Sequence, residues 1–236
     1  MTNAFFTLYQ SLDREGPGEP ADVAWAADVV GLEPDARICD AGCGSGADVP
    51  ALLAAAPEGR ITAVDSHGPF IDELLLRIDA DPRVTAYKGN MAKLKGPYDL
   101  IWSAGALYFL GIEKGLKAWR PTLAKGGAVA FSEPCLFSHA PSEAARAFWA
   151  EYPGVTDAAG IDAQVRAAGY ETVATRRLSD AAWEAYYQPL EARIAMLRPT
   201  AEAALTAVLD ATQTEIDLFR AAKSETGYLL SVVKPA

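Results

Sequence analysis

The sequence predicts an α/β protein whose mainly parallel sheet carries helices on both faces. Two observations lead to this prediction. Short apolar runs rich in Val and Ile alternate with stretches of helical periodicity, and the runs stop at turn-forming residues. Such alternation is typical of right-handed βαβ units, in which helices cover the buried parallel strands.

The first part of the chain contains five predicted strands and the helices between them. The strands are predicted over residues 36–42, 60–66, 83–90, 98–105 and 127–134. Helices are predicted over residues 47–56, 68–80 and 112–127, the last closed by Gly126 and Gly127.

The last third of the chain is predicted to be mostly helical. Helices are expected over residues 141–152 and 160–169, strands over 170–178 and 227–235, and further helical pattern over 179–224. Ser179 and Asp180 are residue types that cap helix N-termini, so a helix is expected to begin there. No repeat or long linker divides the sequence, so residues 1–236 are predicted to form a single domain.

Composition excludes several classes of partner. The formal net charge of −10 opposes general binding to a phosphate backbone or to an anionic membrane surface. No apolar run approaches the roughly 18 residues that span a bilayer. The N-terminal stretch MTNAFFTLYQ lacks the basic start of a secretory signal. A cytoplasmic protein without nucleic-acid or membrane partners is therefore predicted.

Cysteine usage agrees with a reducing compartment. The chain has three cysteines, Cys39, Cys43 and Cys135, which do not form a disulfide framework. Cys39 and Cys43 have no second pair of ligands nearby, so no metal site is predicted.

The stretch ICDAGCGSGAD, from Ile38 to Asp48, follows the first predicted strand and indicates a nucleotide-like ligand. Gly42, Gly44 and Ala47 fit the dinucleotide fingerprint G-x-G-x-x-G/A. Asp40 and Gly46 extend the stretch to a second pattern, D-x-G-x-G-x-G, which indicates a cofactor other than a dinucleotide. Asp65 ends the second predicted strand. Sites for either cofactor have an acid at this position to accept from ribose hydroxyls, so Asp65 does not discriminate between the two cofactors.

Five stretches in order make the chain resemble the class I S-adenosylmethionine-dependent methyltransferases. They are ICDAGCGSGAD, ITAVDS, GNMAKL, YDLIWSAGALYFLG and LAKGGAVAFSEP, within residues 36–135. The resemblance implies a Rossmann-like, seven-stranded sheet whose last strand is antiparallel. It also implies S-adenosylmethionine as methyl donor and S-adenosylhomocysteine as product.

The resemblance further implies which residues bind the cofactor. Asp40 is expected to accept from its amino group, and a carboxylate there would repel the pyrophosphate of a dinucleotide. Asp65 is expected to hold the ribose, and Asn90, where the family often has Asp, to meet the adenine. The full expected set is Asp40, Gly42, Cys43, Gly44, Gly46, Asp65, Ser66, Asn90, Met91 and Ser103.

The acceptor side is less clearly encoded, and a small-molecule acceptor is expected. The segment DREGPG also occurs in the bacterial small-molecule methyltransferases that the chain resembles. Residues 1–30 and the helical insertion 179–224 are predicted to cover the substrate. The expected substrate contacts are Arg14, Gly18, Tyr108, Trp183 and Tyr186, with core packing as the alternative for the aromatic residues.

In-line methyl transfer requires a general base only when the nucleophile arrives protonated. Candidates for that role are His139, Glu133 and Tyr108. Two other functions stay open at this stage: an NAD-linked oxidoreductase, and an S-adenosylmethionine-binding module without catalysis. The sequence does not define the acceptor atom or the oligomeric state.

Overall fold

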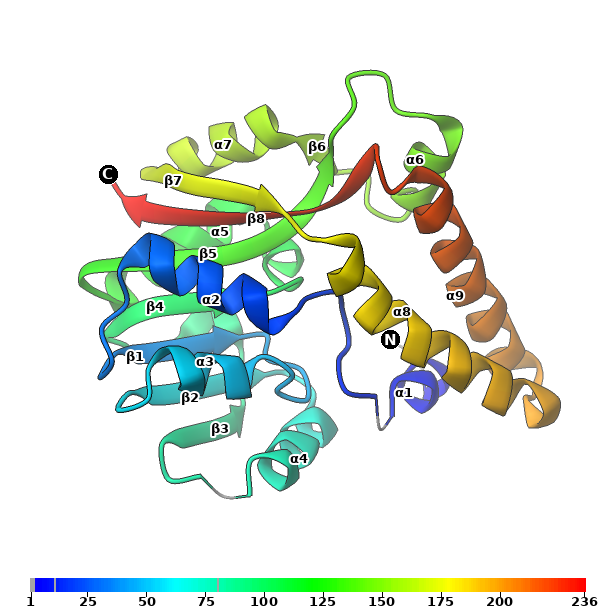
Figure 1. Ribbon diagram of the computed structural model, residues 1–236, viewed down its shortest axis with the longest axis horizontal. Coiled ribbons are helices and arrows are strands. Elements are labelled where there is room, and N and C mark those ends of the chain that lie inside the picture. Colours follow the sequence, from blue (N-terminus) through cyan, green and yellow to red (C-terminus); the bar gives the residue numbers. More distant parts are fainter. Residues whose placement is uncertain (1–2, 11, 80) are drawn as a thin grey trace.

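A computed structural model describes residues 3–10, 12–79 and 81–236 (Figure 1). Its centre is an eight-stranded sheet in the order β3-β2-β1-β4-β5-β8-β7, with the short β6 paired to β5. The strands are β1 (Arg37–Ala41), β2 (Arg60–Asp65), β3 (Val84–Lys88), β4 (Tyr98–Ser103), β5 (Leu123–Leu136), β6 (Thr156–Asp157), β7 (Tyr170–Arg177) and β8 (Thr226–Pro235).

Strand directions confirm the predicted fold class. Strands β3, β2, β1, β4 and β5 are parallel, whereas β8 pairs antiparallel with both β5 and β7. The sheet is therefore Rossmann-like and mainly parallel, with its last strand antiparallel. The two-residue β6 was not expected from the sequence.

Helices cover both faces of the sheet because the two faces of its strands are apolar. Helices α2 (Pro20–Val30) and α3 (Val49–Ala55) pack on one face, and α5 (Ile112–Trp119) and α7 (Ala158–Ala167) on the other (Figure 1). Alternate residues of one strand point to the two hydrophobic cores, one on each face of the sheet. In β1, Ile38 faces the first core and Cys39 the second.

Four further helices gather beyond the carboxyl ends of the parallel strands (Figure 1). They are α1 (Asn3–Tyr9), α6 (Glu143–Phe148), α8 (Asp180–Leu197) and α9 (Ala203–Ala222), whereas α4 (Gly68–Arg77) follows β2. Helices α8 and α9 form a hairpin that also contacts α1 and α6.

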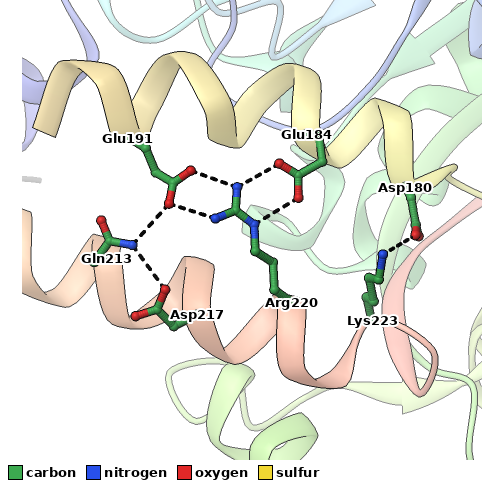
Figure 2. Close-up of polar contacts among 7 residues, drawn as sticks. All are labelled: Asp180, Glu184, Glu191, Gln213, Asp217, Arg220 and Lys223. Atoms are coloured by element: carbon green, nitrogen blue, oxygen red, sulfur yellow. Dashed lines mark hydrogen bonds and ion pairs between the residues drawn. The ribbon is translucent and has the colours of Figure 1, made fainter. Parts of the chain in front are cut away.

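An ionic network joins the two helices of this hairpin (Figure 2). The Arg220 guanidinium donates to Glu184 and Glu191 at 2.7 Å each, so one cation links two carboxylates of α8 to α9. Near the helix ends, Lys223 pairs with Asp180 at 2.5 Å. Networks of this kind fix geometry better than isolated surface pairs do.

One predicted boundary is wrong. Residues 123–127 were expected to end a helix, but they belong to β5, which begins at Leu123. Helix α5 ends at Trp119 because Pro121 has no backbone N–H to continue the helical hydrogen bonds. The predicted helix 68–80 ends at Arg77, and residue 80 lies outside the described residues.

None of the helices built from the described residues is both long and apolar enough to cross a bilayer.

Candidate functional site

A cavity of 680 Å³ lies at the carboxyl ends of the parallel strands. Its walls come from the loops after β1, β2, β3 and β4, from α1 and from the segment after α1. The residues that carry polar or charged side chains into it are Arg14, Glu15, Asp40, Asp48, Asp65, Ser66, His67, Asn90 and Tyr108. The volume is in the range of sites for cofactors and small molecules.

The turn after β1 brings the backbone close to other loops. Gly42 and Gly44 have φ values of 81° and 52°, in the left-handed region that glycine adopts at little cost. A Cβ on Gly42 would clash with Cβ of Ala106, and one on Gly44 with Oε2 of Glu15. These two glycines allow the loop after β4 and the N-terminal segment to close over the turn.

Gly46 has a different role from the one expected. It does not line the cavity, and a Cβ there would lie 2.6 Å from Cγ of Leu74 on α4. Its φ of 82° is again left-handed. Gly46 therefore allows α4 to pack against the turn, and the structure does not support the predicted contact of Gly46 with the cofactor.

Asp40 is a buried carboxylate in the cavity wall. The residue is 3 % exposed, and no described residue donates a hydrogen bond to its side chain. Burial raises the pKa of Asp40 well above its ordinary value, and the nearby negative charges of Asp48, Asp65 and Glu15 raise it further. A positive charge placed in the cavity would relieve this unfavourable burial.

Asp65 ends β2 and organises two loops. One carboxylate oxygen accepts from the Gly44 N–H at 3.1 Å, and the other accepts from the His67 N–H at 2.8 Å. Each oxygen retains a lone pair for a ligand hydroxyl. The imidazole of His67 stacks on Phe6, with ring centroids 3.7 Å apart, so His67 forms part of an aromatic wall.

The N-terminal segment forms one side of the cavity. The Arg14 guanidinium donates to Asp48 at 3.0 Å and to the Gly16 carbonyl at 2.6 Å. Glu15 Oε2 accepts from the Ser45 N–H at 3.0 Å, while Glu15 Oε1 is buried and has no partner among the described residues. Arg14 is thus engaged by Asp48 within the protein.

Asn90 and Met91 follow β3 and line the cavity, as the sequence predicted. The Asn90 side-chain oxygen accepts from the Ala92 N–H at 2.8 Å, so it also caps the short 3₁₀ turn at Met91–Lys93. The Met91 carbonyl accepts from the Trp119 indole N–H at 2.6 Å, which holds the loop against α5.

Tyr108 lines the cavity from the loop after β4, whereas Glu133 lies outside the cavity lining. Glu133 lies near the carboxyl end of β5 and is 4 % exposed, and burial raises its pKa to about 8. The Tyr152 hydroxyl donates to Glu133 at 3.2 Å and also reaches the Tyr108 carbonyl at 3.4 Å.

Several expected site residues lie elsewhere. Ser103 is fully buried and donates to the Ala41 carbonyl at 2.8 Å, so it ties β4 to β1 rather than lining the cavity. Trp183 stacks on Phe219 at 4.0 Å within the aromatic core. The remaining residues outside the cavity lining are Gly18, Glu133, His139 and Tyr186, of which His139 is exposed.

Sequence reasoning missed some residues that shape the site. Glu15 follows Arg14 in the segment DREGPG, and its charge was the feature of the sequence that could have marked it as a site residue. Asp48 follows the glycine turn, and its carboxylate accepts from the Trp102 indole N–H at 2.9 Å. Tyr152 and Tyr228 stand in no local motif, and only the fold brings them to this region.

Comparisons with known proteins agree with this geometry. Residues 38–127 match a family described as a methyltransferase domain. No curated protein matches the chain. A methyltransferase of Geobacter sulfurreducens, crystallised with S-adenosylhomocysteine, has a similar fold with a TM-score of 0.83 at 19 % identity, covering 100 % of this chain and 99 % of that one. A Thiobacillus denitrificans methyltransferase with the same ligand gives 0.83 at 20 % identity and the same coverages.

Geranyl diphosphate C-methyltransferase of Streptomyces coelicolor is also similar, with a TM-score of 0.65 at 16 % identity, covering 92 % of this chain and 78 % of that one. Residues 38–127 thus match a methyltransferase domain, and the fold is that of solved S-adenosylmethionine-dependent methyltransferases. Both findings support the resemblance found in the sequence and the methyl donor it implied.

Proposed function

We propose that the cavity holds S-adenosylmethionine and that the protein transfers its methyl group to a small-molecule acceptor by in-line displacement. The observation that carries this proposal is the buried, unpartnered carboxylate of Asp40 beside the glycine turn. S-adenosylmethionine brings an ammonium group and a sulfonium centre, and an acidic cavity suits both.

The same charges argue against the dinucleotide alternative. Four acids line the cavity: Glu15, Asp40, Asp48 and Asp65. Of these four, only Asp48 is paired with a cation, Arg14. A pyrophosphate at the turn would meet carboxylates without gaining a free counter-charge. The charges of the cavity therefore favour a methyltransferase over an NAD-linked oxidoreductase.

The residues present fit the remaining parts of the donor. Asp65 is proposed to accept from the ribose hydroxyls, since both of its oxygens keep a free lone pair. Asn90 and Met91 are proposed to contact the adenine, with Cys43 and Ser66 beside them in the cavity wall. When bound, S-adenosylmethionine supplies a methyl group on a positively charged sulfur, a good leaving group.

We also propose that residues 1–30 and the α8–α9 hairpin within residues 179–224 cover the acceptor. Support comes from α1, whose Phe5 and Phe6 line the cavity, and from the 2.7 Å contact between the hydroxyls of Tyr9 and Tyr186. This contact joins the N-terminal cap to α8. A closed cover of this kind favours small acceptors over polymers and excludes water from the reacting groups.

Two further parts of the proposal concern substrate contact and location. Of the predicted substrate contacts, Tyr108 and Arg14 line the cavity, and Arg14 is paired with Asp48 there, so Tyr108 is proposed to touch the acceptor. The contacts predicted at Gly18, Trp183 and Tyr186 lie outside the lining and stay predictions. A cytoplasmic location is supported by three buried free cysteines, Cys39, Cys43 and Cys135.

Calorimetry with S-adenosylmethionine and S-adenosylhomocysteine tests the donor site. Asp65→Ala and Gly44→Val are expected to weaken binding at least 100-fold, because the first removes the ribose acceptor and the second fills the turn. The matched controls are Asp72→Ala, an exposed acid on α4, and Gly154→Val, where added atoms meet open space. Unchanged binding in both site variants, or tight binding of NAD alone, would contradict the proposal.

A further inference from the structure

One carboxylate oxygen near the cavity has no partner that accounts for its burial. Glu133 is 4 % exposed and sits near the carboxyl end of β5. Its Oε1 accepts from Tyr152, but its Oε2 is buried and receives no hydrogen bond from any described residue. A buried acceptor left in this state costs about 1–3 kcal/mol, which a ligand can recover.

Three tyrosines lie near this carboxylate. Tyr108, Tyr152 and Tyr228 each lie close enough for the charge of Glu133 to raise their pKa values. Tyr108 lines the cavity, and Tyr228 lies close to the cavity residue Gly105, where an added Cβ would be 3.2 Å from the Tyr228 ring. The rings of Tyr108 and Tyr152 meet edge to face with centroids 5.2 Å apart, and the Tyr152 hydroxyl reaches the Tyr108 carbonyl. Tyr152 therefore links Glu133 to a residue of the cavity wall.

The region also lacks compensating positive charge. Among the described residues, no Lys, Arg or His forms an ion pair or hydrogen bond with Glu133 or Glu215. Glu215 on α9 instead accepts from the Tyr187 hydroxyl at 3.0 Å, and it too raises the pKa values of Tyr108 and Tyr228. Other buried acids differ, as Asp22 pairs with Arg176 and Asp48 with Arg14.

This arrangement selects the charge of an acceptor. Once Glu133 is ionised, an anionic acceptor would lie near a negative charge with no cation to balance it. A cationic acceptor would supply the missing charge, and the faces of tyrosine rings favour cations as well. A neutral acceptor would gain neither interaction.

We propose that the methyl acceptor is a small amine that enters the site protonated, and that Glu133 receives its proton through the tyrosine hydroxyls. This inference rests on the proposed function. Glu133 acts through Tyr108, Tyr152 and Tyr228, so it is a positioning and proton-accepting residue rather than one that touches the reacting atoms.

The step balances in atoms and charge. The ammonium nitrogen loses one proton toward Glu133, and its freed lone pair forms the new N–CH₃ bond. The S–CH₃ bond breaks, and its electron pair stays on sulfur, which becomes neutral. The product carries one positive charge on nitrogen, and Glu133 afterwards returns its proton to water. No metal, oxidant or reductant is involved in this balance.

The surroundings of Glu133 make it suitable for this role. Burial raises its pKa to about 8, and the hydrogen bond from Tyr152 is the opposing, smaller influence. The titratable groups around it are Tyr152, whose hydroxyl donates to it, and Tyr108 and Tyr228, whose pKa values its charge raises together with that of Tyr152. A base of this pKa works efficiently at slightly alkaline pH.

The test uses S-adenosylmethionine with a labelled methyl group and three matched pools of acceptors. Each pool contains the same carbon skeletons, including benzyl, phenethyl and short alkyl groups, as amines, as alcohols or as carboxylic acids. Label is expected in the amine pool at least 10-fold above the other two. Dominant labelling of the alcohols or acids, or an unlabelled amine pool while calorimetry shows donor binding, overturns the inference.

The role of Glu133 is tested with the labelled amine. Glu133→Gln is expected to lower kcat/KM about 100-fold at pH 8 and to remove the rise in kcat/KM between pH 6 and pH 8, while donor affinity stays within 2-fold. Glu171→Gln, an exposed position on β7, is the control. An unchanged pH profile in Glu133→Gln overturns the role.

A second variant guards against misfolding. Tyr152→Phe removes only the hydroxyl that donates to Glu133, and it is expected to shift the rise in kcat/KM to higher pH. A profile identical to that of the unmodified protein contradicts the inference. Loss of donor binding in the unmodified protein would instead contradict the proposed function, so the two failures are distinguishable.

Discussion

The two halves of the cavity are built in different ways. The half proposed to bind the donor uses residues at or just beyond the carboxyl ends of β1, β2 and β3, such as Asp40, Asp65 and Asn90. The half proposed to bind the acceptor has Tyr108 in its wall and Glu133 nearby, with further groups from distant segments after α6 and on β8. Local motifs can therefore encode a donor site, whereas an acceptor site depends on the whole fold.

A chemical difference accompanies this structural one. In the half proposed to bind the donor, Asp65 is held by the backbone N–H groups of Gly44 and His67, and Asp40 and Glu15, each with an oxygen unpartnered among the described residues, lie in the cavity wall itself. Near the half proposed to bind the acceptor, the unpartnered oxygen belongs to Glu133, which lies outside the cavity lining. The two halves thus differ in where their unpartnered carboxyl groups lie, and the following predictions test this contrast.

The largest expected effect is on stability in the acceptor half. The pKa of Glu133 is raised to about 8 from 4.5, so the folded protein holds a proton there that the unfolded chain has lost. Stability relative to Glu133→Gln is therefore expected to fall as pH rises from about 4.5 to 8. The difference corresponds to at most about 5 kcal/mol.

Urea unfolding of both proteins between pH 4 and pH 9 measures this difference. Glu171→Gln, the exposed control, is expected to follow the unmodified protein at every pH. If the free energy of unfolding of Glu133→Gln tracks that of the unmodified protein across the whole range, Glu133 is not a strained acid and the contrast between the two halves fails.

A smaller effect is expected at the glycine turn of the donor half. Gly46→Ala is expected to lower the free energy of unfolding by about 3 kcal/mol, because the new Cβ meets Leu74 at 2.6 Å. Gly126→Ala is the matched control, since its φ is also 82° but its surroundings are open. It is expected to cost only about 1 kcal/mol. Equal losses in the two variants would show that Leu74 is not the constraint.

Much of the fold was predictable from the sequence because its strands are short apolar runs with clear stops. The strand that begins at Leu123 was the exception. Its first residues, LAKGG, end in glycines that also resemble a helix stop, and only pairing with β4 distinguishes the two. The antiparallel direction of β8 came from the family resemblance rather than from periodicity.

The site was predictable to a different extent in each half. The residues Asp40, Asp65, Asn90 and Met91 line the cavity because each lies within three residues of the carboxyl end of a parallel strand, and their contact with the cofactor stays a prediction. Ser103 is also at a strand end, but its side chain points into the sheet and bonds to Ala41. The alternation of side chains along a strand decides such cases, and it requires the exact register.

The acceptor half gave weaker signals for a physical reason. Aromatic residues at helical spacing, such as Trp183 and Tyr186, pack equally well in a core or against a ligand. Here they pack in the core, where Trp183 stacks on Phe219. Glu133 carried a usable signal, since a carboxylate at the end of an apolar strand is costly to bury.

The most direct test of the account is the affinity of S-adenosylmethionine for Asp40→Asn, measured by calorimetry from pH 5 to pH 9. Loss of the buried charge is expected to weaken binding about 30-fold, or about 2 kcal/mol, at the alkaline end. The pKa of Asp40 is raised by burial, so binding to the unmodified protein is expected to strengthen as pH rises. The variant is expected to bind with little pH dependence. Equal affinities of the two proteins at every pH would contradict the claim that this cavity is built for a cationic methyl donor.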